Sequence, residues 1–305
     1  MSEGTREGIL AAEGPVKQTL SHIREKLRLY WQLIKSFQTG LLLLTGVAGF
    51  MSVCCPARSW RTLGALMVTL FLAISGSTVL NMVYDRDIDA RMARTARRPI
   101  PSGQVSVGEA LRLGLALSAL GVGGALALDP LYGLVVGAGL MFDVVIYTIW
   151  LKRRTPWSIV WGGIAGGMPI LAGRTLGAGR IEPIGLLLAL AVLLWIPTHI
   201  MTFGIKHAAD YQRAGVPTFV NRYGERTTRL IISVSTILAV LAMTFAASLI
   251  GIQAHCLYAT VTLGLILAVL TAISLALPSP RLNFGIFKFA SVYMLAAMVL
   301  IILGT

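Results

Sequence analysis

The fold is decided by the stretch from Leu230 to Pro280, which reads LIISVSTILAVLAMTFAASLIGIQAHCLYATVTLGLILAVLTAISLALPSP and contains no Asp, Glu, Lys or Arg. Roughly 20 apolar residues are enough for one helix to cross the hydrocarbon layer of a bilayer. The stretch is much longer than one crossing needs, so we expect two spans that fold back near Gly251 to His255. It therefore predicts a helical protein that crosses a membrane more than once.

The composition of the whole chain agrees with a membrane protein. Of 305 residues, 56% are hydrophobic and 13% are charged, and the mean hydropathy is +0.77. A chain with so little polar surface does not cover a water-facing globule, which excludes a soluble protein. The net charge of +13 would suit nucleic acid, but charge-free stretches separate the short basic segments. We therefore exclude nucleic acid and expect membrane lipid and a phosphorylated substrate as partners.

Seven further segments are candidates for spans, which makes nine in all. One of them contains an acid, Asp143, and the last contains a lysine, Lys288; the other five have no charged residue. The segments are Ser36 to Ala57, Thr62 to Tyr84, Leu113 to Leu128, Pro130 to Leu151, Trp157 to Gly173, Pro183 to Ile205 and Phe284 to Leu303. Asp129 and Pro130 predict a tight turn before the fourth span. The glycines of WGGIAGG, residues 161–167, predict close helix packing in the fifth.

The basic residues give the expected orientation, because cytoplasmic loops are enriched in Lys and Arg. With the N-terminus inside, only Arg58, Arg61, Arg174 and Arg180 fall in outward loops, which leaves 22 of the 26 on the cytoplasmic side. We expect a multi-pass protein of the cell membrane with its C-terminus outside. Residues 1–34 form a polar cytoplasmic segment without a cleavable signal peptide, and residues 35–305 form one nine-helix domain. Cys54, Cys55 and Cys256 have no metal or disulfide spacing.

An acidic cluster follows the second span, where residues 81–89 read NMVYDRDID. Asn81, Asp85 and Asp89 recur every fourth residue, so a continuing helix places them on one face. Oxygen ligands in this arrangement suit Mg²⁺, which takes its remaining ligands from water and phosphate. Four arginines that could bind a polyphosphate follow: Arg91, Arg94, Arg97 and Arg98. The alternative is a charged loop at a membrane surface, and Asp87 lies off the shared face as a candidate partner for an arginine.

A second polar group lies near the end of the sixth span. His199 follows Pro197 inside the span and either contacts a ligand or bonds to a neighbouring helix. Asp210 either pairs with Lys206, one turn earlier, or forms a second metal or phosphate site opposite the acidic cluster. Lys35, at the start of the first span, is either a topology anchor or a phosphate contact.

Asp143 is the one acid expected inside a span. A carboxylate at this depth is usually functional or paired. Tyr147, one turn later, is the candidate partner, and the alternative is a neutral, structural Asp143.

At these residues the chain resembles the UbiA-type intramembrane prenyltransferases, whose first aspartate-rich motif, NxxxDxxxD, is filled by Asn81, Asp85 and Asp89. The string NMVYDRDIDARMARTARRPIPSG, residues 81–103, is most similar to the protoheme IX farnesyltransferase (heme O synthase) branch. Two further strings resemble that branch: YTIWLKRRTPWSIVWGGIAGGMP, residues 147–169, and WIPTHI followed by ADYQRAGVP within residues 195–217.

The resemblance implies an all-helical bundle of nine spans around a central cavity. It implies that Mg²⁺ joins a prenyl diphosphate of the farnesyl, geranyl or geranylgeranyl type to two aspartate-bearing loops, and that the acceptor is heme B. The metal ligands would be Asn81, Asp85, Asp89 and Asp210. The catalytic residues would be these three aspartates and Tyr147. The substrate contacts would be Lys35, Asn81, Arg94, Arg98, Lys152, Arg153, His199 and Lys206.

The chain departs from the family pattern at the second motif. Lys206 and Ala214 stand four residues before and after Asp210, so a second DxxxD is absent, and Ala209 stands where the heme branch often has an acid. A 4-hydroxybenzoate-type quinone precursor or an ether lipid therefore remains the alternative acceptor. A transporter or cation carrier is a competing class. The gathering of acids at one membrane face argues against it.

Overall fold

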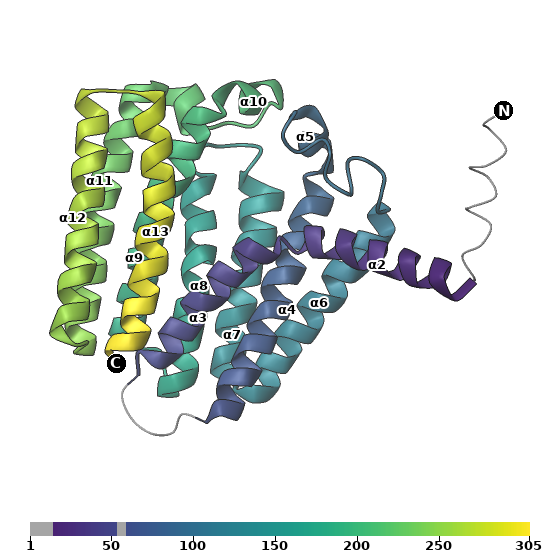
Figure 1. Ribbon diagram of the computed structural model, residues 1–305, viewed down its shortest axis with the longest axis horizontal. Helices are drawn as coiled ribbons and strands as arrows, with labels where there is room; N and C mark the ends of the chain where they lie inside the picture. Colours follow the sequence, from purple (N-terminus) through teal and green to yellow (C-terminus); the bar gives the residue numbers. More distant parts are fainter. Residues whose placement is uncertain (1–14, 54–58) are drawn as a thin grey trace, which may run out of the picture.

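The computed structural model describes residues 15–53 and 59–305, and within those ranges every regular element is a helix (Figure 1). The elements are α2 (Pro15–Leu33), α3 (Ser36–Met51), α4 (Trp60–Tyr84), α5 (Arg86–Arg91), α6 (Val107–Leu128), α7 (Pro130–Leu140), η1 (Met141–Leu151), α8 (Ser158–Ala178), α9 (Pro183–Lys206), α10 (Ala208–Arg213), α11 (Phe219–Ile250), α12 (Ala254–Ala276) and α13 (Pro280–Gly304). Cys256 is buried and has a free thiol. Cys54 and Cys55 lie outside the described residues.

Seven of the described helices are long and apolar enough to cross a membrane: α4, α6, the continuous pair α7 and η1, α9, α11, α12 and α13. The pair α2 and α3, bent by 55° at its break, gives an eighth if it is counted as one span. The chain is therefore an integral membrane protein, and the predicted all-helical class is confirmed. The remaining expected span corresponds to α8, which contains Arg174 and is not among these seven.

The helix ends follow the local chemistry of the chain. Asp129 caps α7 by accepting a hydrogen bond from the Tyr132 amide at 2.7 Å, which confirms the predicted turn into the fourth span. Gly251 ends α11 with φ of 78°, a conformation that suits glycine, and this confirms the predicted fold-back. The helix α11 starts at Phe219, earlier than expected. Its first turns are polar, so the apolar stretch did not indicate them, and the helix breaks at Gly224, where φ is 81°.

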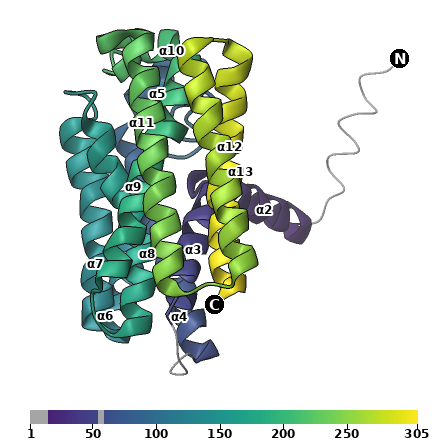
Figure 2. The same ribbon diagram turned by 90° about the vertical axis from the view of Figure 1, so that its left-hand side faces the viewer.

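Glycines let the central helices meet backbone to backbone. A Cβ added to Gly173 of α8 would lie 1.9 Å from the carbonyl oxygen of Gly46 in α3. A Cβ on Gly167 would lie 2.7 Å from the carbonyl oxygen of Ala189 in α9. Gly167 belongs to the glycine-rich segment of the fifth predicted span, so close packing there is confirmed. The helix α8 thus forms the centre of the bundle, between α3 and α9 (Figure 2).

The short helices α5 and α10 lie at the same end of the bundle (Figures 1 and 2). They belong to one apolar cluster, in which Ile88 and Met92 pack with Ala214 and Val216. The two loops that carry the aspartates are therefore in contact, although more than 100 residues separate them in the sequence.

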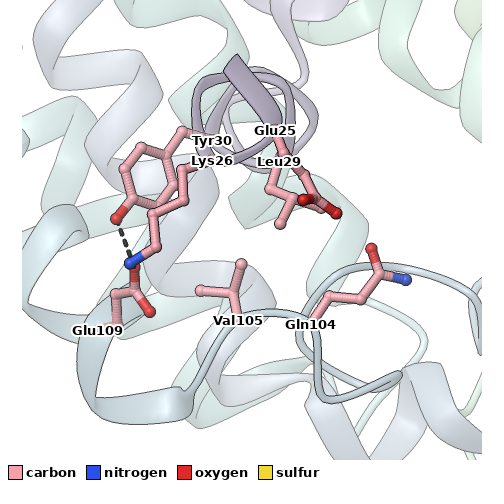
Figure 3. Close-up of a pocket in the computed structure, with 7 residues that line it drawn as sticks. All are labelled: Glu25, Lys26, Leu29, Tyr30, Gln104, Val105 and Glu109. Atoms are coloured by element: carbon pink, nitrogen blue, oxygen red, sulfur yellow. Dashed lines mark hydrogen bonds and ion pairs between the residues drawn. The ribbon is translucent and has the colours of Figure 1, made fainter. Parts of the chain in front are cut away.

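The helix α2 leaves the bundle at an angle and packs beside the start of α6 (Figure 1). A small cleft between them is lined in part by Glu25, Leu29 and Gln104 (Figure 3). Glu109 of α6 accepts hydrogen bonds from Tyr30 and Lys26, the latter at 3.4 Å. These bonds attach the described part of the N-terminal segment to the bundle.

Candidate active site

The acidic cluster lies where α4 passes into α5. Asp85 breaks the regular helix, with φ of −85° and ψ of 5°, but its amide still bonds to the Asn81 carbonyl at 2.9 Å. The Asp89 amide bonds to the Asp85 carbonyl at 2.8 Å. The backbone ladder therefore continues through all three residues. Both aspartates are buried, each with 5% of its surface exposed.

Each buried carboxylate faces one cation. Asp89 Oδ2 accepts a hydrogen bond from Arg98 Nη1 at 2.7 Å, and Asp85 Oδ2 forms an ion pair with Lys152 Nζ. The other oxygen of Asp85, Oδ1, is buried and has no hydrogen-bond partner in the described structure. A buried acceptor without a partner is unfavourable, so this oxygen is available to a further cation or donor.

Three cations converge beside these carboxylates. Burial would lower the pKa of Lys152, but Tyr147 and Asp85 together raise it above its ordinary value, so this lysine stays charged. Lys35, just before α3, has a left-handed backbone with φ of 45°. Burial, followed by the charges of Arg98 and Lys152, lowers its pKa to about 8. Positive groups held so close to one another favour the binding of an anion.

Asn81 is held by η1 rather than left free. Its Nδ2 donates to Asp143 Oδ2 at 2.8 Å, and Ser77 Oγ donates to the same oxygen at 2.5 Å. Thr148, fully buried, donates to Asn81 Oδ1 at 2.8 Å. Because η1 is a π-helix with i to i+5 bonding, Asp143 and Thr148 share one face and both reach Asn81. Asp143 is therefore paired with Asn81 and Ser77, and the expected pairing with Tyr147 is wrong.

Arg153 and Asp87 form a separate ion pair. Two guanidinium nitrogens of Arg153 donate to the two carboxylate oxygens of Asp87, at 2.8 and 2.6 Å. One of them also donates to the Tyr84 carbonyl at 2.8 Å. The hydrogen bond from Arg153 lowers the pKa of Asp87. Asp87 is thus the partner of an arginine, as predicted.

Asp210 has different partners from those expected. It pairs with Arg213 and lies 3.6 Å from His207 Nδ1. Lys206 instead places its Nζ 3.5 Å from the ring centre of Phe284, so the expected pairing of Asp210 with Lys206 is wrong. Within the described ranges, no three His, Cys, Asp or Glu side chains lie close enough together to hold a metal ion by themselves.

His199 and Arg94 lie among aromatic rings. The His199 ring stacks between Trp195 and Phe287, at centroid distances of 5.0 and 4.6 Å. Arg94 lies 5.0 Å from the ring centre of Phe203. His199 Nδ1 also forms a hydrogen bond with Ser291 Oγ of α13 at 3.1 Å, so His199 bonds to a neighbouring helix, which was one of its two predicted roles.

Sequence reasoning missed several residues around the site. Ser77 lies one helical turn before Asn81, so the four-residue spacing could have indicated it. Thr148 could not be found in the same way, because only π-helical geometry aligns it with Asp143. Phe287 was missed because it belongs to the last span, where most residues are hydrophobic and one phenylalanine does not stand out.

The chain matches the UbiA prenyltransferase family over residues 42–303. A protoheme IX farnesyltransferase of Korarchaeum cryptofilum is 42% identical over 212 residues, which cover 69% of this chain and 71% of that protein. A protoheme IX farnesyltransferase of Thermofilum pendens is 38% identical over 239 residues, covering 78% of this chain and 84% of that protein.

Solved structures share the fold at lower identity. A digeranylgeranylglyceryl phosphate synthase superposes with a TM-score of 0.76 at 20% identity, covering 92% of this chain and 98% of that one. A UbiA homolog from Archaeoglobus fulgidus bound to GPP and Mg²⁺ superposes with a TM-score of 0.68 at 17% identity, covering 90% and 99%. The helical arrangement described above is therefore that of these proteins.

Proposed function

This chain belongs to the UbiA prenyltransferase family, and from that premise we propose that it is a Mg²⁺-dependent enzyme that transfers a farnesyl group from farnesyl diphosphate to protoheme IX, giving heme O. Relatives with the name protoheme IX farnesyltransferase support both substrates, at identities of 42% and 38%. The A. fulgidus homolog bound to GPP and Mg²⁺ supports the metal.

The observation that carries the proposal is a pair of buried carboxylates, those of Asp85 and Asp89, in which one oxygen of Asp85 has no hydrogen-bond partner. Asp85 Oδ1 is buried and unbonded in the described structure, and Asp89 is equally buried nearby in the chain. Mg²⁺ prefers oxygen ligands but keeps several waters and takes others from substrate phosphates. Two aspartates therefore fit it without a closed protein cage. Asn81 and Asp210 are the further proposed ligands from the two loops.

When bound, Mg²⁺ would neutralise charge on the diphosphate. The chain's own contribution is the group of cations beside the carboxylates. Negative charge grows on the diphosphate as the allylic C–O bond breaks, so ammonium and guanidinium groups already in place stabilise the transition state more than the substrate. We assign this role to Lys35, Arg98 and Lys152. Tyr147, whose ring centre lies 5.6 Å from Lys152 Nζ, would border the reacting carbon.

The apolar bundle would supply the second requirement, a dry cavity for the isoprenoid chain. Water would quench an allylic cation before the acceptor's electron-rich carbon could attack it, so the site must exclude water. We place the acceptor on the side of His199, whose ring already stacks with other aromatic groups. Arg153, bound to Asp87, would hold the loop after η1 against α5.

The remaining features of the proposal concern topology. We propose nine spans, with α3 and α8 added to the seven long apolar helices, in one domain from residue 35 to residue 305. The common location of α5 and α10 at one end of the bundle supports a single face for the active-site loops. The distribution of Lys and Arg supports a cytoplasmic position for that face and for the N-terminus.

Purified protein in lipid nanodiscs tests the proposal. The protein is supplied with Mg²⁺, labelled farnesyl diphosphate and one of three acceptors, and the products are identified by mass spectrometry. We expect label on protoheme IX and not on 4-hydroxybenzoate or a glycerol phosphate ether lipid. Transfer to either of the other acceptors would overturn the heme assignment. Failure to release diphosphate with any acceptor would overturn the enzymatic assignment.

A further inference from the structure

Aromatic rings form a continuous row between α9 and α13, which lie side by side (Figures 1 and 2). Trp195, His199 and Phe203 recur every fourth residue and share one face of α9. Phe287 of α13 lies 4.6 Å from His199 and 5.5 Å from Phe203, and Phe284 lies 6.0 Å from Phe287. We call these five side chains the ring ladder. All five side chains are partly buried.

Three cations lie at the loop end of the ring ladder. Lys206 and Lys288 place their Nζ atoms 3.5 and 4.7 Å from the centre of the same ring, that of Phe284. Arg94 lies over Phe203. In the described part of the chain none of these three cations has a carboxylate within 4.0 Å, although Asp210 is only four residues from Lys206 in the sequence.

This arrangement favours the binding of an anion. The ammonium groups of Lys206 and Lys288 both lie near the Phe284 ring, so the distance between them is at most the sum of their distances to its centre. Like charges at such a separation repel. A cation over an aromatic face gains a modest attraction, but that attraction does not remove the repulsion. Asp210 is already engaged by Arg213 and His207. A ligand with two negative charges would neutralise both lysines.

The rings define the rest of the ligand. A row of partly buried aromatic rings offers a surface on which a flat, extended π-system can pack. A porphyrin combines such a plane with two carboxylates on one edge, whereas a benzoate has only one carboxylate and an ether lipid has no π-system. Arg94 follows α5 in the chain, so this end of the ladder lies beside the loop that carries Asp89.

We propose that the ring ladder is the docking site of the porphyrin acceptor and that Lys206 and Lys288 bind its two carboxylates. The inference rests on the proposed function for the identity of the acceptor and adds the site that selects it. It assigns Phe284, Phe287 and Lys288 of the last span to acceptor binding.

Porphyrin binding in nanodiscs, without Mg²⁺ or prenyl diphosphate, tests the site. The probes are protoheme IX and its dimethyl ester, which keeps the plane and lacks both charges, titrated by their visible absorbance. Exposed ion pairs are worth up to about fivefold in affinity, so Lys206→Gln and Lys288→Gln should each raise the Kd of protoheme IX about threefold to fivefold. The double variant should raise it more than tenfold, and the Kd of the ester should stay unchanged.

Arg281→Gln is the matched control, because Arg281 is an exposed cation in the first turn of the same helix, α13, and touches none of the ladder rings. It should bind both probes like the wild type. Phe284→Leu should weaken both probes, because it removes a ring and leaves the lysines. Equal losses for protoheme IX and its ester in the double variant, or unchanged binding of both, would overturn the proposal.

The two proposals fail in different ways. If porphyrin binding depended on the lysines but the protein transferred no prenyl group, the docking site would be supported and the proposed reaction refuted. If the lysine double variant had the wild-type kcat and KM for protoheme IX, the proposed reaction would be supported and the docking site refuted.

Discussion

The hydrogen bonds of Asp143 lead to a quantitative prediction, because one substitution removes the acceptor of two donors. Ser77 Oγ and Asn81 Nδ2 lie 2.5 and 2.8 Å from Asp143 Oδ2. In Asp143→Leu, which has a similar volume, both donors face an apolar group. An unsatisfied buried donor is unfavourable by about 1 to 3 kcal/mol. Since Asp143 is only half-buried, we take the lower limit for each donor and expect a loss of about 2 kcal/mol in the free energy of unfolding.

Asp143→Asn separates geometry from charge. Its amide oxygen can take the place of Oδ2 and accept from both Asn81 and Ser77. We expect this variant to lose less than about 1 kcal/mol, since both contacts have a neutral replacement.

The assays are unfolding in detergent and steady-state kinetics. Loss of a side chain that orients a ligand residue typically weakens binding by about 10-fold or more. Asp143→Leu should therefore raise the KM for farnesyl diphosphate about 10-fold at fixed Mg²⁺, and Asp143→Asn less than about threefold. Wild-type stability and KM in Asp143→Leu would refute the claim that Asp143 positions Asn81.

Three other substitutions give clear expectations. Gly173→Val should destabilise the protein by more than about 3 kcal/mol in thermal unfolding, because a Cβ already lies 1.9 Å from the Gly46 carbonyl oxygen; wild-type stability would contradict that packing. Lys152→Met leaves the Asp85 carboxylate uncompensated, so it should lower the melting temperature without Mg²⁺, and added Mg²⁺ should restore part of the loss; no effect of Mg²⁺ would count against binding at Asp85. Asp87→Asn should be less stable than the wild type at pH 7 by under about 1 kcal/mol, since the pair is partly exposed. Because Arg153 lowers the folded-state pKa of Asp87 below its unfolded value, that difference should begin to shrink as the pH falls below about 4 and vanish once the pH is below the folded-state pKa. A difference that persisted in stronger acid would exclude the ion pair as its cause.

The sequence predicted the features that depend on local spacing. The fold-back at Gly251 followed from an apolar stretch too long for one span, and the turn at Asp129 followed from its capping chemistry. Asn81, Asp85 and Asp89 could be grouped because four-residue spacing survives the break between α4 and α5. These are properties of one segment and its own backbone.

Contacts between segments were harder to predict. The pairing of Asp143 depends on the π-helical register of η1, which the sequence does not mark. Lys206 was expected to pair with Asp210 because they are one turn apart, but the helix ends between them and Phe284 from α13 lies closer. The ring ladder could not be predicted for the same reason, since two of its five rings come from α13, which is distant from α9 in the sequence.

The central claim is that the buried carboxylate of Asp85 activates the prenyl diphosphate through Mg²⁺. The direct measurement is diphosphate release by Asp85→Asn and by Asp87→Asn, with farnesyl diphosphate, protoheme IX and a titration of Mg²⁺. Asp87 is the matched control, because it lies two residues away in the same loop and pairs with Arg153 outside the cluster. We predict that Asp85→Asn loses at least about 100-fold in rate while remaining folded, and that Asp87→Asn keeps most of the wild-type rate with the same Mg²⁺ dependence. Wild-type turnover and Mg²⁺ dependence in Asp85→Asn would contradict the claim.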